Sequence, residues 1–240
     1  MMTAAADDRA CQTRCHATRS GRIVEQGPAA LLADHATMFI LEHLTVRRGD
    51  RVAEPGCGTG VLSLYAALAG ARSVVGTDVD PDALAAARQN AAANGVANVC
   101  FVQGSLLEPV PAGLDLVVAN LPHKPAPRPF DRRYYGGPDG TDLLLEVIGQ
   151  AAGRLVAGGR LVLYANSIAN PRRVAREFAR DFDVRLLAEK RRYFTREEWD
   201  GLAPGMFAHL EARKACGEAD FEQDDQGLYF MARLYEGVRR

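Results

Sequence analysis

Residues 51–61 read Arg-Val-Ala-Glu-Pro-Gly-Cys-Gly-Thr-Gly-Val, a short apolar run followed by three closely spaced glycines. Beyond them, apolar residues recur with the spacing of one helical face, at Val61, Leu64, Tyr65 and Leu68. The stretch is therefore typical of a β-strand that passes through a tight turn into a helix. Because glycines carry no side chain, a ligand can approach the backbone and the start of the helix at such a turn. This pattern indicates a nucleotide-like ligand.

The spacing of the glycines separates this turn from a dinucleotide-binding turn. Gly56, Gly58 and Gly60 follow the pattern G-x-G-x-G, whereas the dinucleotide fingerprint needs its third glycine at position 61, which is valine. The spacing therefore disfavours NAD. Asp78 ends the next apolar run about twenty residues further on, where a carboxylate can accept hydrogen bonds from two ribose hydroxyls.

Short β-branched runs alternate with helical patterns from residue 51 onward, which predicts an α/β fold with a mainly parallel sheet. The predicted strands are 51–54, 73–77, 99–102, 114–119, 160–165, 184–188 and 228–234. Helices are predicted after Gly60, from Pro81 with Asp80 as its cap and Gly95 closing it, from Leu144 to Gly158, and from Pro171. The 39 residues between the last two strands are too many for a hairpin and predict a helical insertion at about 190–227.

The chain before residue 51 has weaker patterns. Residues 1–22 lack apolar periodicity and are expected to form a mobile tail. Residues 23–50 contain Leu31, Phe39, Ile40 and Leu44 at partly helical spacing, which predicts a leading helical segment. That helix is expected either to lie across the cofactor edge of the sheet or simply to cover apolar surface. Residues 23–240 are thus expected to form a single domain.

Composition sets the class of protein. With 240 residues, 48% hydrophobic and 25% charged, the chain is expected to be a soluble globular domain, and with no signal or membrane segment it is expected to be cytoplasmic. Five cysteines, an odd number, argue against a disulfide framework. Cys11, Cys15 and His16 lie close together but lack a fourth ligand at zinc spacing, so no metal is expected. A net charge of -1 offers no global basic field for nucleic acid.

Four motifs make the chain resemble the class I S-adenosylmethionine-dependent methyltransferases from about residue 31 to the C-terminus. They are Ala53–Ser63, Gly76–Pro81, Gln103–Leu107 and Asn120–His123. The resemblance implies a Rossmann-like, doubly wound sheet of seven strands, mostly parallel with the last strand antiparallel, and S-adenosyl-L-methionine as cofactor. It implies cofactor contacts from the glycine turn, the end of the second strand, a turn after the third strand and the end of the fourth: Glu54, Gly56, Gly58, Thr59, Gly60, Asp78, Val79, Gly104, Ser105, Leu106 and Asn120. Families of this kind usually have Asp where this chain has Ser105, and serine can still hydrogen-bond the adenine amino group.

The stretch Asn120-Leu-Pro-His123 resembles the Asn/Asp-Pro-Pro-Tyr/Phe motif of methyltransferases that modify planar amide or amino nitrogens. In that motif the Asn carbonyl and a backbone carbonyl accept the N–H groups of the substrate nitrogen, and the aromatic ring stacks on the planar group. Here Leu121 replaces the first proline and His123 replaces the ring. Histidine can stack, but it can also accept a proton, which suits a hydroxyl or ammonium acceptor. Asn120 and His123 are the candidate catalytic residues; a strand-end turn and a water-facing loop histidine are the alternatives.

A basic loop follows the motif. Lys124, Arg128, Arg132 and Arg133 lie on a proline-rich loop that is expected either to clamp an acidic substrate group or to be simply solvated. The predicted substrate contacts are Pro122, His123, Lys124 and Arg128. The following segment, Tyr134–Leu144, resembles the Gly-Gly-x-Asp-Gly run of release-factor glutamine methyltransferases.

Three hypotheses for function follow. The leading one is methyl transfer to a nitrogen or oxygen of a small-molecule or peptide acceptor, which can carry an anionic group. The second is an RNA, DNA or protein-glutamine N-methyltransferase, and the third is a cofactor-binding module without catalysis. Large apolar residues in 190–227 predict a lid or a homo-oligomer contact there, with local packing as the alternative: Tyr193, Phe194, Trp199, Met206 and Phe207.

Overall fold

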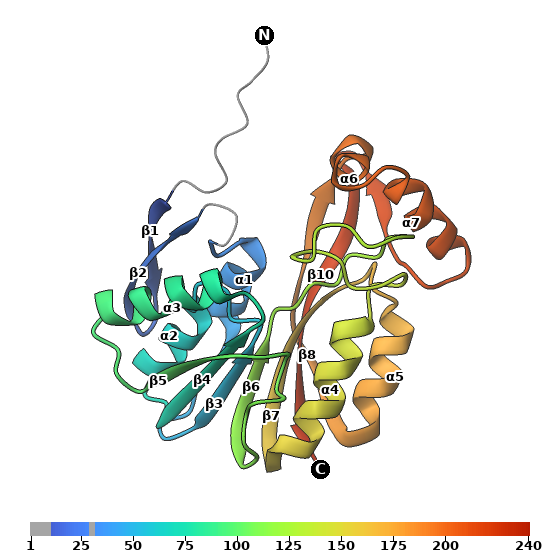
Figure 1. The fold of residues 1–240 in the computed structure, drawn as a ribbon. Coiled ribbons are helices and arrows are strands. Elements are labelled where there is room, and N and C mark those ends of the chain that lie inside the picture. The colour runs from blue at the N-terminus through green and yellow to red at the C-terminus, as the bar shows by residue number, and fades with distance from the viewer. Residues whose placement is uncertain (1–10, 29–31) are drawn as a thin grey trace. The chain divides into compact units, whose positions relative to one another are not determined.

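The computed structural model describes residues 11–28 and 32–240 and divides into two compact units, Met1–Val118 and Ala119–Arg240 (Figure 1). No helix in the described part of the chain is long and apolar enough to cross a membrane.

The first unit is built on parallel strands. They are β3 (Arg51–Pro55), β4 (Ser73–Asp78), β5 (Val99–Gln103) and β6 (Leu114–Ala119), in the order β5-β4-β3-β6. The β3–β4 register places Glu54 beside Gly76 and Pro55 beside Thr77, so the carboxyl ends of both strands lie at the same edge. The predicted strands thus agree with the observed ones to within one residue at each end.

Three helices flank these strands: α1 (His35–His43), α2 (Val61–Leu68) and α3 (Pro81–Ala93). Local chemistry explains the bounds of α3, because the Asp80 side chain accepts the Asp82 N–H at 3.0 Å and Pro81 occupies the first turn. Gly95 follows the helix with φ of 66°, a conformation that favours glycine. This helix was predicted correctly.

The chain before α1 differs from the prediction. Cys11–Thr18 (β1) and Gly21–Pro28 (β2) pair as an antiparallel hairpin, so residues 11–22 are not a tail (Figure 1). The leading helix is also shorter than residues 23–50, and Leu31 lies outside the described residues. The inward positions of β2 explain the error: Ile23 is apolar, but Glu25 and Gly27 are not, which hides the alternation of a strand.

The second unit contains three long strands. They are β7 (Leu155–Asn166), β8 (Phe182–Phe194) and β10 (Gly227–Arg239), in the order β7-β10-β8, and the short β9 (Glu222–Asp224) pairs with β10. The last strand is antiparallel to both neighbours, as predicted. Helices α4 (Asp142–Arg154) and α5 (Pro171–Asp181) pack against each other and against these strands. Helix α4 ends before the predicted Gly158, which instead lies inside β7.

The predicted insertion is helical, with α6 (Arg196–Leu202) and α7 (Met206–Ala215). Its large apolar side chains do not face solvent. Phe194, Trp199, Met206 and Phe207 are buried in a cluster with Phe221 and Phe230. These side chains are therefore not available for an oligomer contact, and the alternative of local packing describes them.

Candidate functional site

The glycine turn after β3 has the backbone that its residues require. Gly56, Gly58 and Gly60 have φ angles of 68°, 53° and 84°, in the left-handed region that favours glycine. Gly60 is the N-cap of α2, and a Cβ atom there would lie 2.8 Å from the Phe101 ring. The turn therefore presents backbone rather than side chains at the start of α2, which suits a ligand that approaches closely.

Asp78 ties this turn to the next strand. One of its carboxylate oxygens accepts the Gly58 N–H at 2.9 Å, and the other accepts the Asp80 N–H at 2.9 Å. A carboxylate offers about four acceptor sites. Asp78 thus anchors the glycine turn and keeps the capacity to accept two hydroxyl groups, which is what a ribose presents.

Glu54 and Cys57 are buried beside the turn. Burial raises the pKa of Glu54 to about 8, although a hydrogen bond from the Ser63 hydroxyl at 2.5 Å opposes the shift. Burial also raises the pKa of the Cys57 thiol well above its ordinary value. Cys57 is therefore a neutral thiol at physiological pH and not a nucleophile.

We expect the raised pKa of Glu54 to make the protein lose stability as the pH rises. Between its ordinary value of 4.5 and about 8, the native state keeps a proton that the unfolded chain has lost. This proton contributes stability that is fully present below pH 4.5 and disappears on approach to pH 8, a loss of roughly 3 kcal/mol between pH 5 and 7.5. Glu54→Gln should flatten this dependence. Urea unfolding at several pH values tests it, and parallel curves for both proteins would contradict it.

A second turn follows β5 at the same edge. The Gly104 N–H donates to the Asp78 carbonyl at 3.0 Å, and the Thr77 hydroxyl donates to the Leu106 carbonyl at 2.5 Å. Leu106 has φ of 45°, a conformation uncommon for a non-glycine residue, so the surrounding bonds hold the turn in a strained shape. Beside it, Val79 is 51% exposed. An exposed apolar side chain next to Asp78 can cover one face of a planar ring.

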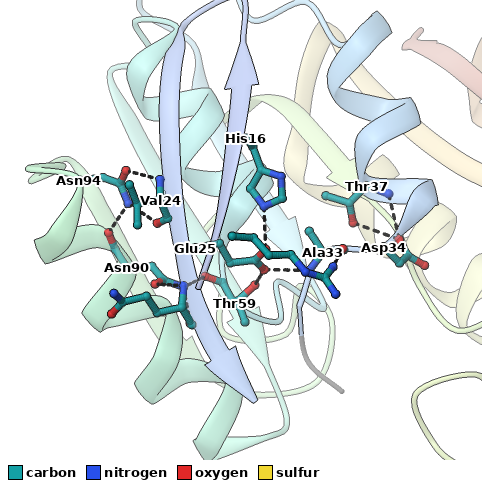
Figure 2. Close-up of polar contacts among 11 residues, drawn as sticks. His16, Val24, Glu25, Ala33, Asp34, Thr37, Thr59, Asn90 and Asn94 are labelled. Atoms are coloured by element: carbon teal, nitrogen blue, oxygen red, sulfur yellow. Dashed lines mark hydrogen bonds and ion pairs between the residues drawn. The ribbon is translucent and has the colours of Figure 1, made fainter. Parts of the chain in front are cut away.

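Glu25 links the hairpin to the glycine turn, as Figure 2 shows. It is fully buried, and one carboxylate oxygen accepts the Thr59 hydroxyl and the Ala33 N–H, the latter at 2.8 Å. The other oxygen lies 2.7 Å from His16 Nε2. The hairpin therefore packs on the predicted cofactor turn through a buried carboxylate that sequence reasoning missed.

Two asparagines, Asn90 in α3 and Asn94 at its C-cap, hold the same hairpin (Figure 2). The Asn90 side chain bonds both the N–H and the carbonyl of Gln26, at 2.8 and 3.0 Å, and Asn94 does the same for Val24 at 2.8 and 2.7 Å. Asn90 also donates to the Thr59 carbonyl at 3.1 Å. The two amides lie one helical turn apart and bond the backbone of β2 as a neighbouring strand would.

Within residues 11–28 and 32–240, no three His, Cys, Asp or Glu side chains gather as a metal site.

In the second unit, His123 is buried at 7% exposure rather than facing water. Its Nδ1 donates to the Leu121 carbonyl at 2.5 Å, because a carbonyl can only accept. The neutral ring then carries its proton on Nδ1 and leaves Nε2 as the acceptor nitrogen. The ring also meets Tyr164 edge-on, with centroids 5.5 Å apart. Asn120 lies three residues earlier and is half-buried.

The Gly-Gly-x-Asp-Gly segment, residues 136–140, packs behind His123. The Gly136 N–H donates to the Lys124 carbonyl at 3.1 Å, and a Cβ atom on Gly136 would collide with His123 Cα. A Cβ atom on Gly140 would lie 2.6 Å from the His123 carbonyl oxygen. From α7, His209 Nε2 donates to the Pro138 carbonyl at 2.6 Å. The insertion therefore supports the loop behind the candidate acceptor motif.

Basic residues predicted as an anion clamp have local partners. The Lys124 ammonium lies 4.6 Å from the centroid of the Tyr134 ring and 5.5 Å from that of Trp199. Arg133 pairs with Asp131 at 2.5 Å. Arg128 and Arg132 are exposed. A clamp by all four side chains remains a prediction.

Comparisons with known proteins agree with this geometry. Over 135 residues the chain is 40% identical to a release factor glutamine methyltransferase of Deinococcus radiodurans, covering 51% of this chain and 48% of that protein. It is 30% identical to a putative protein N5-glutamine methyltransferase of Methanocaldococcus jannaschii, covering 55% and 70%. It is 37% identical to a ribosomal protein L11 methyltransferase of Geobacter sulfurreducens, covering 53% and 36%. The chain thus spans about half or less of the first and third of these relatives.

Among solved structures, a T. thermophilus 16S rRNA N2 methyltransferase in complex with AdoMet and guanosine matches 96% of this chain and 51% of that one, with a TM-score of 0.64 and 19% identity. This likeness shows the fold, which is the predicted Rossmann-like α/β fold. The methyltransferase small domain family matches residues 29–195, which include the glycine turn, Asp78 and the Asn120–His123 motif. On that match, the chain belongs to the methyltransferase small domain family.

Proposed function

We propose that the protein transfers a methyl group from S-adenosyl-L-methionine to a nitrogen or oxygen of a small-molecule or peptide acceptor. The observation that carries the proposal is the Asp78 carboxylate, which holds the glycine turn through Gly58 and keeps capacity for two hydroxyls. The family match supports the same conclusion.

The residues of the first unit fit this cofactor. Asp78 would accept the ribose hydroxyls, the glycine turn would meet the amino-acid part, and Val79 with the Gly104–Leu106 turn would meet the adenine. The bare backbone at Gly56 and Gly58 and the strained Leu106 are what a closely fitted ligand needs. When bound, the cofactor supplies an electrophilic methyl group on a sulfonium sulfur.

The acceptor motif would orient the substrate. The Asn120 amide oxygen can accept an N–H or O–H of the acceptor, which directs the lone pair of the acceptor atom. His123 is fixed by its bond to the Leu121 carbonyl and by Tyr164, so its Nε2 can receive a proton or a hydrogen bond at a defined place. A buried ring held edge-on is a poor stacking platform.

A second candidate is methylation of a glutamine amide in a protein. The names of the Deinococcus and Methanocaldococcus relatives favour it, as does the Gly136–Gly140 segment behind His123. In that case the Asn120 side-chain carbonyl and a neighbouring backbone carbonyl would accept the two N–H groups of a planar amide, and a peptide rather than a small molecule would be the substrate.

Incubation of the purified chain with methyl-labelled S-adenosylmethionine and a cell extract tests both candidates. We expect label in small molecules or short peptides, and none with Asp78→Ala. Label on glutamine of an intact protein would favour the second candidate, and nuclease-sensitive label would point to nucleic acid. If S-adenosylmethionine binds but no fraction is labelled, the protein is a binding module and the proposal is wrong.

A further inference from the structure

A cavity of about 410 Å³ opens in the second unit, where the start of α5 meets the end of α7. Four arginines and two carboxylates dominate its lining: Arg172, Arg173, Arg176 and Arg213, with Asp139 and Glu218. Its volume is within the roughly 300 to 1,000 Å³ of small-molecule sites. The lining carries four positive and two negative charges, so the cavity favours an anion.

The two carboxylates are already paired with two of the arginines. Arg173 lies 2.9 Å from Asp139, and Arg213 pairs with Glu218 and lies 3.8 Å from Asp139. Among the described residues no ion pair is recorded for Arg172, and Arg176 is 3.1 Å from Glu177, which is outside the lining. Two guanidinium groups thus add positive charge that the carboxylates of the lining do not offset.

The place of the arginines on α5 is unfavourable without a ligand. Arg172 and Arg173 lie in the first turn of this 11-residue helix, Arg176 lies in the second, and the first turn holds no acidic residue. The start of a helix carries partial positive charge, which disfavours cations and favours anions. Guanidinium groups also match the oxygens of a phosphate with paired hydrogen bonds.

We propose that this cavity binds a phosphate group. A phosphate monoester carries a charge of about -1.5 to -2 near neutral pH, which balances the excess of about two positive charges on the lining. One wall of the cavity, Asp139, belongs to the loop behind the acceptor motif, because its neighbour Gly140 packs on the His123 carbonyl. The assignment of this phosphate to the methyl acceptor rests on the proposed function. The binding of phosphate in the cavity does not depend on that function.

Titration calorimetry of the full chain with inorganic phosphate, without S-adenosylmethionine, tests the site. We expect Arg172→Ala combined with Arg176→Ala to weaken binding at least about tenfold. Arg180→Ala, on the same helix but outside the lining, should leave binding unchanged. Arg172→Gln, at an exposed position, should weaken binding on its own and gives a second test if the double variant is unstable. Equal affinity in all these proteins, or no binding at all, would overturn the proposal.

Competition identifies the source of the phosphate. Ribose 5-phosphate and a 12-nucleotide single-stranded RNA are each added to the phosphate-loaded protein. Displacement mainly by ribose 5-phosphate assigns the cavity to a small phosphorylated molecule, and displacement mainly by RNA assigns it to a phosphodiester backbone. If neither compound displaces the phosphate, the cavity does not serve a phosphorylated substrate and the proposal is contradicted. These measurements do not involve methyl transfer. They can therefore refute the phosphate site without refuting the proposed function, and a failure of the proposed function leaves the phosphate site untouched.

Discussion

Replacement of Asp78 by alanine is expected to weaken the binding of S-adenosylmethionine about a hundredfold while the fold persists. The carboxylate would lose its bonds to the ribose hydroxyls, and hydrogen bonds to a charged group contribute about 1.5 to 3 kcal/mol. A hundredfold change corresponds to about 2.7 kcal/mol. The variant also loses the bond from the Gly58 N–H, which loosens the glycine turn itself.

Calorimetry with S-adenosylmethionine or S-adenosylhomocysteine measures the effect. Asp82→Ala is the matched control, because Asp82 is exposed in the first turn of α3 and the change removes the same charge. Its affinity should match that of the unaltered protein. Asp78→Asn should lie between the two, since one oxygen still accepts a hydrogen bond. Unchanged affinity in a folded Asp78→Ala protein would refute the assignment of the cofactor site.

The parts of this site that the sequence predicts are those with local causes. The turn from β3 to α2 follows from three glycines at positions with positive φ, and α3 follows from Asp80, Pro81 and Gly95 at its ends. The positions of Asp78 and the Gly104–Leu106 turn follow from the alternation of strands and helices, because the ends of parallel strands meet at one edge.

The parts that were missed depend on partners distant in sequence. The β1–β2 hairpin is held by Asn90, Asn94 and Thr59, which lie 34 to 70 residues away from the strand residues that they bond. Its central inward residue, Glu25, is a buried charge that no apolar pattern reveals. The aromatic surroundings of Lys124 likewise come from Tyr134 and from Trp199 in the insertion. No pattern within either segment specifies such contacts.

Asn120→Ala is expected to lower turnover at least about a hundredfold, with the affinity for S-adenosylmethionine nearly unchanged. Orientation of the acceptor can supply several kcal/mol of barrier lowering, so its loss affects the rate more than cofactor binding. Asn120→Asp is the matched variant, because it keeps an acceptor oxygen at the same place and should retain much more activity. Equal losses in both would show that the amide N–H groups, not the oxygen, are required.

His123 decides between proton handling and packing. His123→Phe keeps a ring of similar size against Tyr164 but removes the bond to the Leu121 carbonyl and the acceptor nitrogen Nε2. If this nitrogen accepts a proton or a hydrogen bond from the substrate, the variant should lose most of its turnover while its melting temperature changes little. A fully active His123→Phe protein would show that the ring only packs, and Asn120 would then be the main group that positions the acceptor.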